Sequence, residues 1–255
     1  MSKKWPIWRK RRNLNEKYPE AIFFDLDDTL ITDDTGSEGI WDDLCFRYAL
    51  YLETVTGQQL LQAIQSARTW YWSDTERHRQ GRLDLSKARY EVIATAFSSL
   101  NIRDDKLAGR MALEYSHLKE ARISPMPGAF ETLEFLYKEG IKLALITNGA
   151  SAMQRSKINR FDLGAYFQTI VIEGEFGCGK PDVSVFFHAM HQVNAAAETT
   201  WMVGNDLSRD VQGANDAGIF SIWVDIHGTG LQVHHQSRPD RIIRGVSELM
   251  SHSKS

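Results

Sequence analysis

Cysteine is scarce in this chain, with Cys45 and Cys178 as the two copies among 255 residues. Two cysteines exclude the multi-disulfide framework of small secreted proteins and are typical of a reducing compartment. The chain also lacks any run of about 18 apolar residues, so no transmembrane helix is predicted. Its first twelve residues lack the apolar segment that a secretory signal contains. Together these absences predict a cytoplasmic protein with no membrane partner.

Internal repeats and low-complexity segments are absent as well, and the composition is that of an ordinary globular protein. Hydrophobic residues make up 42% of the chain and charged residues 25%, which is consistent with a soluble protein that has a hydrophobic core. At about 150 residues per domain, the length allows one large domain or two smaller ones. No association face is apparent, and both a monomer and a homodimer are compatible with the sequence.

Charge is distributed unevenly along the chain. The net charge is −3, residues 1–12 contribute six positive charges and no acid, and the rest therefore carries −9. The basic segment, with Trp5 and Trp8, fits either a contact with an anionic membrane or nucleic acid, or a solvated leader. Short termini are usually poorly ordered, so residues 1–18 are interpreted as a basic leader. The acidic remainder argues against a nucleic-acid partner.

Strand-like and helical patterns alternate in the second half of the chain. Strands are predicted over 142–146, 169–172, 200–203 and 220–224, and helices over 128–138, 150–160, 183–193 and 208–217. Strands separated by helices of about ten residues predict βαβ units and a parallel sheet. The apolar segment 21–24 predicts one more strand, which a long helical stretch separates from the others.

The predicted fold is therefore α/β, with a Rossmann-like parallel-sheet core and an inserted α-helical cap domain. The core is assigned to residues 19–34 and 124–255, and the cap domain to residues 35–123. Within the cap, one helix is predicted to start near Asp84 and another to cover 104–119.

Two aspartates directly follow the first predicted strand. The apolar residues 21–24 break into Asp25-Leu26-Asp27-Asp28-Thr29, as expected where a buried strand ends. Ligands of parallel α/β sheets bind at this edge. Asp25 and Asp27 can both turn toward one small site, where two close carboxylates require a cation, a shared proton or a phosphoryl group between them.

Polar groups also follow three later strands. These are Thr147-Asn148-Gly149, Lys180-Pro181, and Gly204-Asn205-Asp206 with Asp210 further on. Each is weak alone, because such residues more often form turns, helix caps or solvated surface. Four such groups in chain order, each after a strand, predict that an acid pair, a hydroxyl with an amide, a lysine and a second acid cluster converge on one edge of the sheet.

This ordered set resembles the motifs of the haloacid dehalogenase-like hydrolase superfamily, in its capped branch, over about residues 21–250. Asp25-Leu26-Asp27-Asp28-Thr29 is similar to the first motif, Thr147 to the second, Lys180-Pro181 to the third and the segment 204–210 to the fourth. The resemblance implies that Asp25 is a nucleophile that forms an aspartyl-phosphate. It also implies that Asp27 first protonates the leaving oxygen and later deprotonates the attacking water.

The resemblance implies roles for the other motif residues too. Thr147 and the backbone amides near Leu26, Asp27 and Asn148 would hold phosphoryl oxygens. Lys180 would neutralise charge and keep Asp25 ionised. Mg²⁺ suits an all-oxygen site formed by Asp25, the Asp27 carbonyl and the acid cluster that contains Asn205, Asp206 and Asp210.

Asp27 indicates the reaction class. Dehalogenases of the superfamily lack this second acid, because halide leaves without a proton, whereas an alkoxide leaving group needs one. General acid catalysis contributes roughly 10²–10⁴-fold in rate. The predicted function is therefore Mg²⁺-dependent hydrolysis of small phosphomonoesters of the sugar phosphate, nucleoside monophosphate or phosphoglycolate type. The alternatives are a phosphomutase of the β-phosphoglucomutase type and a non-catalytic regulatory binding protein.

The fourth motif departs from the common pattern. That pattern has Asp after Gly204, and here the position is Asn205, with Asp206 next and Asp210 at the second acid position. Asn205 could bind Mg²⁺ through its side-chain oxygen, or Asp206 could supply the charge instead. Both possibilities are open from the sequence.

An aromatic and basic patch in the predicted cap provides candidates for contacts with the leaving group. Its members are Trp70, Tyr71, Trp72, Arg77, His78 and Arg79. Trp72 and Arg77 are the predicted substrate contacts in this patch. The opposing interpretation is that the aromatic residues pack in the core of the cap and the basic residues form a solvated helix end.

Overall fold

The structure is a computed structural model that describes residues 18–34, 37, 39–232 and 236–253. The basic leader predicted over 1–18 lies outside this range except for Tyr18. Among the described residues, no helix is long and apolar enough to cross a membrane.

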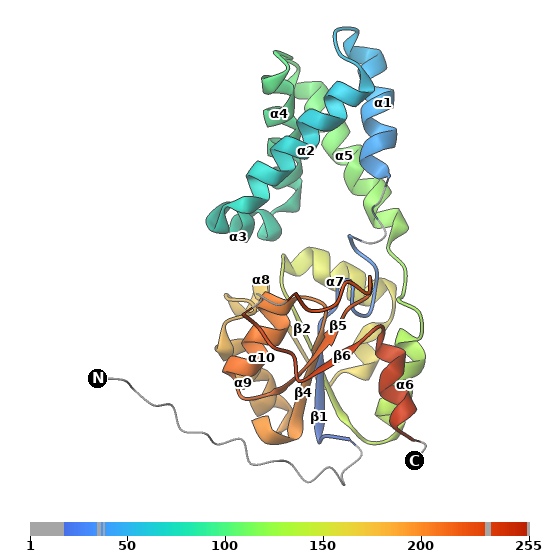
Figure 1. Ribbon diagram of the computed structural model, residues 1–255, viewed down its shortest axis with the longest axis vertical. Helices are drawn as coiled ribbons and strands as arrows, with labels where there is room; N and C mark the ends of the chain where they lie inside the picture. The colour runs from blue at the N-terminus through green and yellow to red at the C-terminus, as the bar shows by residue number, and fades with distance from the viewer. Residues whose placement is uncertain (1–17, 35–36, 38, 233–235, 254–255) are drawn as a thin grey trace, which may run out of the picture.

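A six-stranded parallel sheet forms the centre of the molecule, as the alternating pattern predicted (Figure 1). Its strands are β1 (Ala21–Phe24), β2 (Lys142–Thr147), β3 (Thr169–Ile172), β4 (Thr200–Gly204), β5 (Phe220–Val224) and β6 (Arg241–Ile243). The spatial order is β3-β2-β1-β4-β5-β6, and all neighbours are parallel. β6 was not predicted, because it is three residues long and only Ile243 in it is buried.

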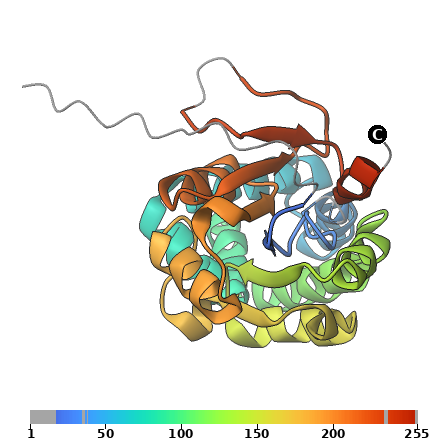
Figure 2. The same ribbon diagram turned by 90° about the horizontal axis from the view of Figure 1, so that it is seen from below.

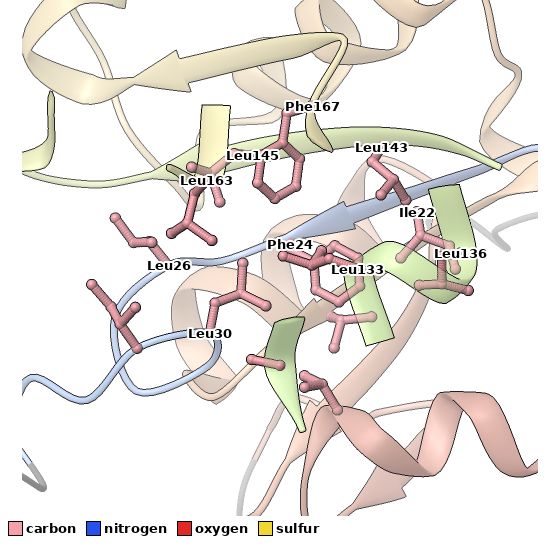
Figure 3. Packing of buried hydrophobic residues seen from close by; sticks show 14 of the residues in the cluster. Ile22, Phe24, Leu26, Leu30, Leu133, Leu136, Leu143, Leu145, Leu163 and Phe167 are labelled. Carbon is pink, nitrogen blue, oxygen red and sulfur yellow. The ribbon is translucent and has the colours of Figure 1, made fainter. Parts of the chain in front are cut away.

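The central strand β1 is buried on both faces, and its alternate residues belong to different layers of the core. Ile22 and Phe24 pack against α6 (Ala129–Lys138) in one hydrophobic cluster, which Figure 3 shows from close by. Ala21 and Phe23 belong to a second cluster, which includes buried residues of α9 (Val183–Val193) and α10 (Gln212–Asp216). Helices therefore cover both faces of the sheet, which is the reason that its strands read as continuous apolar runs.

The remaining core helices connect the strands. They are α7 (Ser151–Arg160) and the short α8 (Glu173–Phe176). The helix predicted over 208–217 is less regular: a π-helical turn (Leu207–Val211) comes first and α10 follows. The Asp206 carboxylate caps this turn by accepting the amides of Ser208 and Arg209 at 2.9 and 2.8 Å.

Five helices form an insert between β1 and α6, which we call the cap. They are α1 (Ile40–Leu52), α2 (Gly57–Ser73), α3 (Thr75–Leu83), α4 (Leu85–Ser99) and α5 (Asp105–Arg122). The start predicted at Asp84 is confirmed, since its carboxylate accepts the Lys87 amide at 3.0 Å as an N-cap. The cap has a hydrophobic cluster of its own and stands over the edge of the sheet where β1 ends (Figure 1). In the view from below, the core lies in front of the cap (Figure 2).

Candidate active site

A cavity of about 410 Å³ lies between the cap and the carboxyl edge of the sheet. β1 pairs with β2 on one side and β4 on the other, so residues that follow these strands meet at this edge. Of the predicted site residues, the cavity is lined by Asp25, Asp27, Trp72, Thr147, Asn148, Lys180, Asn205, Asp206 and Asp210. Leu26 and Arg77 do not line it. The Leu26 side chain is buried in the core, so only its backbone can serve a ligand.

A buried lysine joins the first and fourth motifs. Lys180 Nζ lies 2.5 Å from Asp25 Oδ1 and 2.7 Å from Asp210 Oδ1, and its side chain is 1% exposed. Gly204 faces the Asp210 carboxylate so closely that any side chain at this position would collide with it. Burial lowers the pKa of Lys180, but Asp210 and Asp25 outweigh this effect and raise it overall. Lys180 therefore stays protonated and supplies a fixed positive charge beside Asp25.

Burial and the neighbouring Lys180 act on the pKa of Asp25 in opposite directions. Burial raises its pKa from 3.8 to about 6, although Lys180 acts in the opposite direction. Lys180 therefore favours the ionised form, as the resemblance implied, but burial has the larger effect. At neutral pH Asp25 is mostly a carboxylate, which is the form required of a nucleophile.

The second aspartate is fixed by two side chains that the sequence analysis did not single out. Asp27 accepts hydrogen bonds from Lys157 Nζ at 2.7 Å and from Gln154 Nε2 at 2.9 Å. Both donors come from α7, three residues apart on one helix face. Removal from water raises the pKa of Asp27, although Lys157 lowers it. Asp27 is therefore a positioned carboxyl group with a raised pKa, which suits a general acid.

The loop after β2 is tied to the loop that carries Lys180. The Asn148 side chain donates to the Lys180 carbonyl and accepts from the Lys180 amide, both at 2.8 Å. Gln154 Nε2 also donates to Thr147 Oγ1 at 2.6 Å, so α7 holds Thr147 and Asp27 together. The Asn148 side chain is thus a positioning group, and its backbone amide is the part to which the resemblance assigns a contact with phosphate.

In the fourth motif, the two candidate metal ligands have different surroundings. The Asp206 carboxylate faces Arg209, whose Nη2 and Nε lie 2.5 and 2.8 Å from Oδ2. Asn205 is held through its backbone, since Trp223 Nε1 donates to its carbonyl at 2.8 Å. The Asn205 side chain lines the cavity and makes no hydrogen bond within the described part of the chain.

The donors around Asp25 are of the type that hard cations prefer. Asp25, Asp210 and Asn205 offer oxygen atoms at one end of the cavity. Buried Asp210 Oδ1 forms an ion pair with Lys180 but accepts no well-aligned hydrogen bond. Among the described residues, no group of three His, Cys, Asp or Glu side chains has the arrangement of a metal site. A metal ligand set here therefore has to include an amide or backbone oxygen.

The predicted aromatic and basic patch of the cap divides into two parts. Trp72 and His78 line the cavity and contact each other edge to face, with ring centroids 5.3 Å apart. Arg77 instead lies outside, with its guanidinium carbon 4.1 Å from the Trp70 ring centroid and a hydrogen bond to the Trp70 carbonyl. Its predicted substrate contact is therefore not supported, because cation–π stacking turns the side chain toward Trp70.

An ion pair connects the cap to the core at the rim of the cavity. Arg82 of α3 binds both carboxylate oxygens of Glu173 at 2.7 and 2.6 Å. Glu173 also accepts the Gly149 amide at 2.9 Å, in the loop that follows Thr147 at the end of β2. No spacing in the sequence pointed to this pair, because its partners are 91 residues apart and follow no shared pattern.

Comparison with known proteins found relatives that align with most of the chain. The chain is 30% identical over 224 residues to pyrimidine 5'-nucleotidase YjjG of Escherichia coli, a match that covers 87% of this chain and 89% of that protein. It is 30% identical over 222 residues to phosphoserine phosphatase of Thermus thermophilus, covering 81% and 88%. The fold is similar to that of the HAD-hydrolase YfnB of Bacillus subtilis, with a TM-score of 0.68, 20% identity and coverage of 92% and 98%.

The family model for haloacid dehalogenase-like hydrolases matches residues 19–218, which include β1 with its aspartates, the whole cap, Lys180 and Asp210. The chain therefore belongs to the haloacid dehalogenase-like hydrolase family.

Proposed function

We propose that this protein is a phosphatase that hydrolyses small phosphomonoesters through an aspartyl-phosphate on Asp25. The observation that carries the proposal is the second carboxyl group, Asp27, held by Lys157 and Gln154 in the same cavity as Asp25. An alkoxide leaving group needs a proton, and a carboxyl group with a raised pKa can supply it. The similar nucleotidase and phosphoserine phosphatase support ester hydrolysis, while their different substrates leave the leaving group open.

The first step in the proposed reaction is the attack of Asp25 on phosphorus. One carboxylate oxygen forms the new P–O bond while the bond to the leaving oxygen breaks. Lys180 stays bound to Asp25 and keeps the buried nucleophile ionised against the effect of burial. Asp27 transfers its proton to the leaving oxygen, so that the alcohol departs neutral.

In the second step, water displaces Asp25 from phosphorus. Asp27, now ionised, takes a proton from this water, and the cycle returns both aspartates to their starting states. The Thr147 hydroxyl and the backbone amides of Leu26, Asp27 and Asn148 are the proposed donors to the phosphoryl oxygens. Thr147 is 2% exposed and is held by Gln154, so it is preorganised for this contact.

We further propose that the site binds Mg²⁺ through Asp25, the Asp27 carbonyl and Asn205, with Asp210 contributing charge. Two observations support this set: within the described residues, the Asn205 side chain makes no hydrogen bond and Asp210 Oδ1 accepts no well-aligned one. The Asp206 carboxylate is the weaker candidate, because Arg209 and two backbone amides already satisfy it. A bound Mg²⁺ would neutralise charge on the phosphate and on Asp25.

The test is a panel of sugar phosphates, nucleoside monophosphates, phosphoglycolate and p-nitrophenyl phosphate, assayed by phosphate release with Mg²⁺. Asp25→Asn should abolish turnover of every ester, and Asn205→Ala should raise the Mg²⁺ concentration needed for half-maximal rate. Full activity of a contaminant-free Asp25→Asn preparation would refute the mechanism. Cytoplasmic location, the absence of a nucleic-acid partner and a monomeric or homodimeric state stay predictions, the first supported by the free thiols of Cys45 and Cys178.

A further inference from the structure

The basic side chains of the cavity differ in whether they have acidic partners. Among the described residues, the lining contains Arg68, Arg82, Arg89, Lys119, Lys157, Lys180 and Arg209. Five of them form ion pairs: Arg82 with Glu173, Lys119 with Asp33 and Asp34, Lys157 with Asp27 and Asp33, Lys180 with Asp25 and Asp210, and Arg209 with Asp206. Arg68 and Arg89 are the two described lining cations that have no carboxylate partner.

Both unpaired arginines come from the cap and are partly buried. Arg89 of α4 donates one hydrogen bond to a neutral partner, Ser116 Oγ, at 2.8 Å. Arg68 of α2 makes no hydrogen bond within the described residues. A guanidinium group stays charged at any physiological pH, so each presents donors that no carboxylate among the described residues satisfies. Burial even lowers the pKa of Arg89, as expected for a cation without a neutralising anion.

An aromatic pair lies beside the two arginines. Trp41 and Tyr115 are stacked with ring centroids 3.9 Å apart, which leaves no room for a guanidinium between them. The guanidinium carbon of Arg68 lies 5.7 Å from the Trp41 centroid, and that of Arg89 lies 5.5 Å from the Tyr115 centroid. All four side chains line the same cavity as Asp25.

A third donor in this group is also unsatisfied. Trp41 is 8% exposed, and its Nε1 is buried without an acceptor within the described part of the chain. Buried donors without acceptors are rare in folded proteins. The cap side of the cavity therefore holds two cations that have no carboxylate partner among the described residues, next to a buried indole N–H.

We propose that Arg68 and Arg89, which line the cavity beside the Trp41–Tyr115 pair, bind a second anionic group on the leaving-group part of the substrate. The substrate class is then phosphomonoesters of acidic molecules, which carry a carboxylate or a second phosphate apart from the scissile one. Arginine matches both groups because its planar donors pair with two anion oxygens at once. This inference rests on the proposed phosphatase function and adds the chemical class of the leaving group.

The test compares esters that differ only in the second charge. 3-Phosphoglycerate and glycerol 3-phosphate form one pair, since a carboxylate in the first replaces a hydroxymethyl group in the second. Fructose 1,6-bisphosphate and fructose 6-phosphate form another, in which the second group is a phosphate. The ratio of kcat/KM within each pair measures recognition of the second anion, and the two pairs separate a carboxylate from a phosphate. p-Nitrophenyl phosphate reports the reaction without a second anion.

Three variants test whether the kcat/KM ratio within each pair depends on Arg68 and Arg89. Arg68→Gln and Arg89→Gln should each lower the preference for the anionic ester by about 10- to 100-fold, as for the loss of a charged hydrogen bond. Their loss of rate on p-nitrophenyl phosphate, which carries no second anion, should be much smaller than their loss on the anionic esters. Arg110→Gln is the matched control: Arg110 also lies over cap aromatic rings, 5.0 Å from Tyr51, but outside the cavity. It should leave every ratio unchanged.

The outcomes separate this inference from the proposed function. A wild-type preference for one anionic ester that falls in Arg68→Gln or Arg89→Gln and persists in Arg110→Gln supports the inference. Equal rates within both pairs, or faster turnover of a nucleoside monophosphate than of either anionic ester, would overturn it while the phosphatase function stands. Hydrolysis of no ester, including p-nitrophenyl phosphate, would overturn the proposed function and this inference with it.

Discussion

Replacing Lys180 with methionine removes the one buried cation between Asp25 and Asp210. Methionine keeps most of the side-chain volume, so the change acts mainly on charge. Lys180 and Asp210 are 2% and 1% exposed and Asp25 is 8% exposed, so the two carboxylates would be left facing each other away from water. Breaking a buried ion pair by removing one partner costs about 3–5 kcal/mol. For a chain of this size that loss lowers Tm by roughly 10 °C.

The loss of stability in Lys180→Met should depend on pH, and the pKa values determine the direction of this dependence. The folded-state pKa of Asp25, about 6, lies above the unfolded value of 3.8, so its ionisation reduces stability as the pH rises between these values. Without Lys180 the pKa rises further, and the penalty extends to higher pH. Lys180 itself has a raised pKa, so in the wild type its contribution is present at every pH below 10.5. The destabilisation should therefore be near its maximum at pH 8 and fall to about 1–2 kcal/mol at pH 4.5, where Asp25 is protonated.

Urea unfolding at pH 4.5 and pH 8 in the presence of EDTA measures this difference without any contribution from divalent cations. The double variant Lys180→Met/Asp25→Asn should recover much of the lost stability at pH 8, because one of the two carboxylates that repel each other is gone. Lys138→Met is the control, since Lys138 is 70% exposed and pairs with Glu134 on one helix, where such pairs contribute about 0.3–0.5 kcal/mol. A loss of equal size at both pH values, or none, would refute the electrostatic account of this site.

Three further changes test other parts of the site. Asp27→Asn should lower kcat about 10²–10⁴-fold for alkyl phosphates but much less for p-nitrophenyl phosphate, whose leaving group needs no proton; equal losses on both would contradict its role as general acid. Arg82→Gln should raise KM, because the contact of the cap with Glu173 is lost; unchanged steady-state kinetics would argue against a role in cap closure. Gly204→Ala should abolish activity, because a Cβ at this position collides with the Asp210 carboxylate; wild-type kinetics in this variant would show that the Asp210 position is not needed.

The convergence of polar residues at the carboxyl ends of the strands could be predicted, because a parallel sheet brings these ends together. Asp25 directly follows β1, Thr147 is the last residue of β2 and the segment with Asp210 follows β4. The carboxyl ends of these parallel strands meet at one edge whatever the packing of the helices. The strands over 169–172 and 220–224 were predicted to the residue, since short, mostly apolar segments that lie between polar or helical ones have clear ends.

Residues on helices could not be assigned to the site in the same way. Gln154 and Lys157 reach Asp27 because α7 turns one particular face toward the sheet edge, and helical spacing alone does not identify that face. Side chains of the cap are even harder to assign from the sequence. Arg77 and Arg82 lie on the same short helix, yet Arg77 contacts Trp70 and Arg82 reaches Glu173. Which of them meets the core depends on how the entire insert is oriented over the sheet, and this orientation is not encoded in any local pattern.

The shared use of Lys157 by two aspartates connects the position of the cap to the strength of the general acid. Lys157 lies 2.7 Å from Asp27 and 3.2 Å from Asp33, and Asp33 also binds Lys119 of the cap helix α5 at 2.9 Å. While Lys119 neutralises Asp33, Lys157 is available to Asp27. Any displacement of α5 that separates Lys119 from Asp33 makes the two carboxylates compete for one ammonium group, and Asp27 then holds its proton more tightly. Cap position and proton affinity are thus linked quantities, and by thermodynamic reciprocity protonation of Asp27 must alter the equilibrium between cap positions by the same free energy.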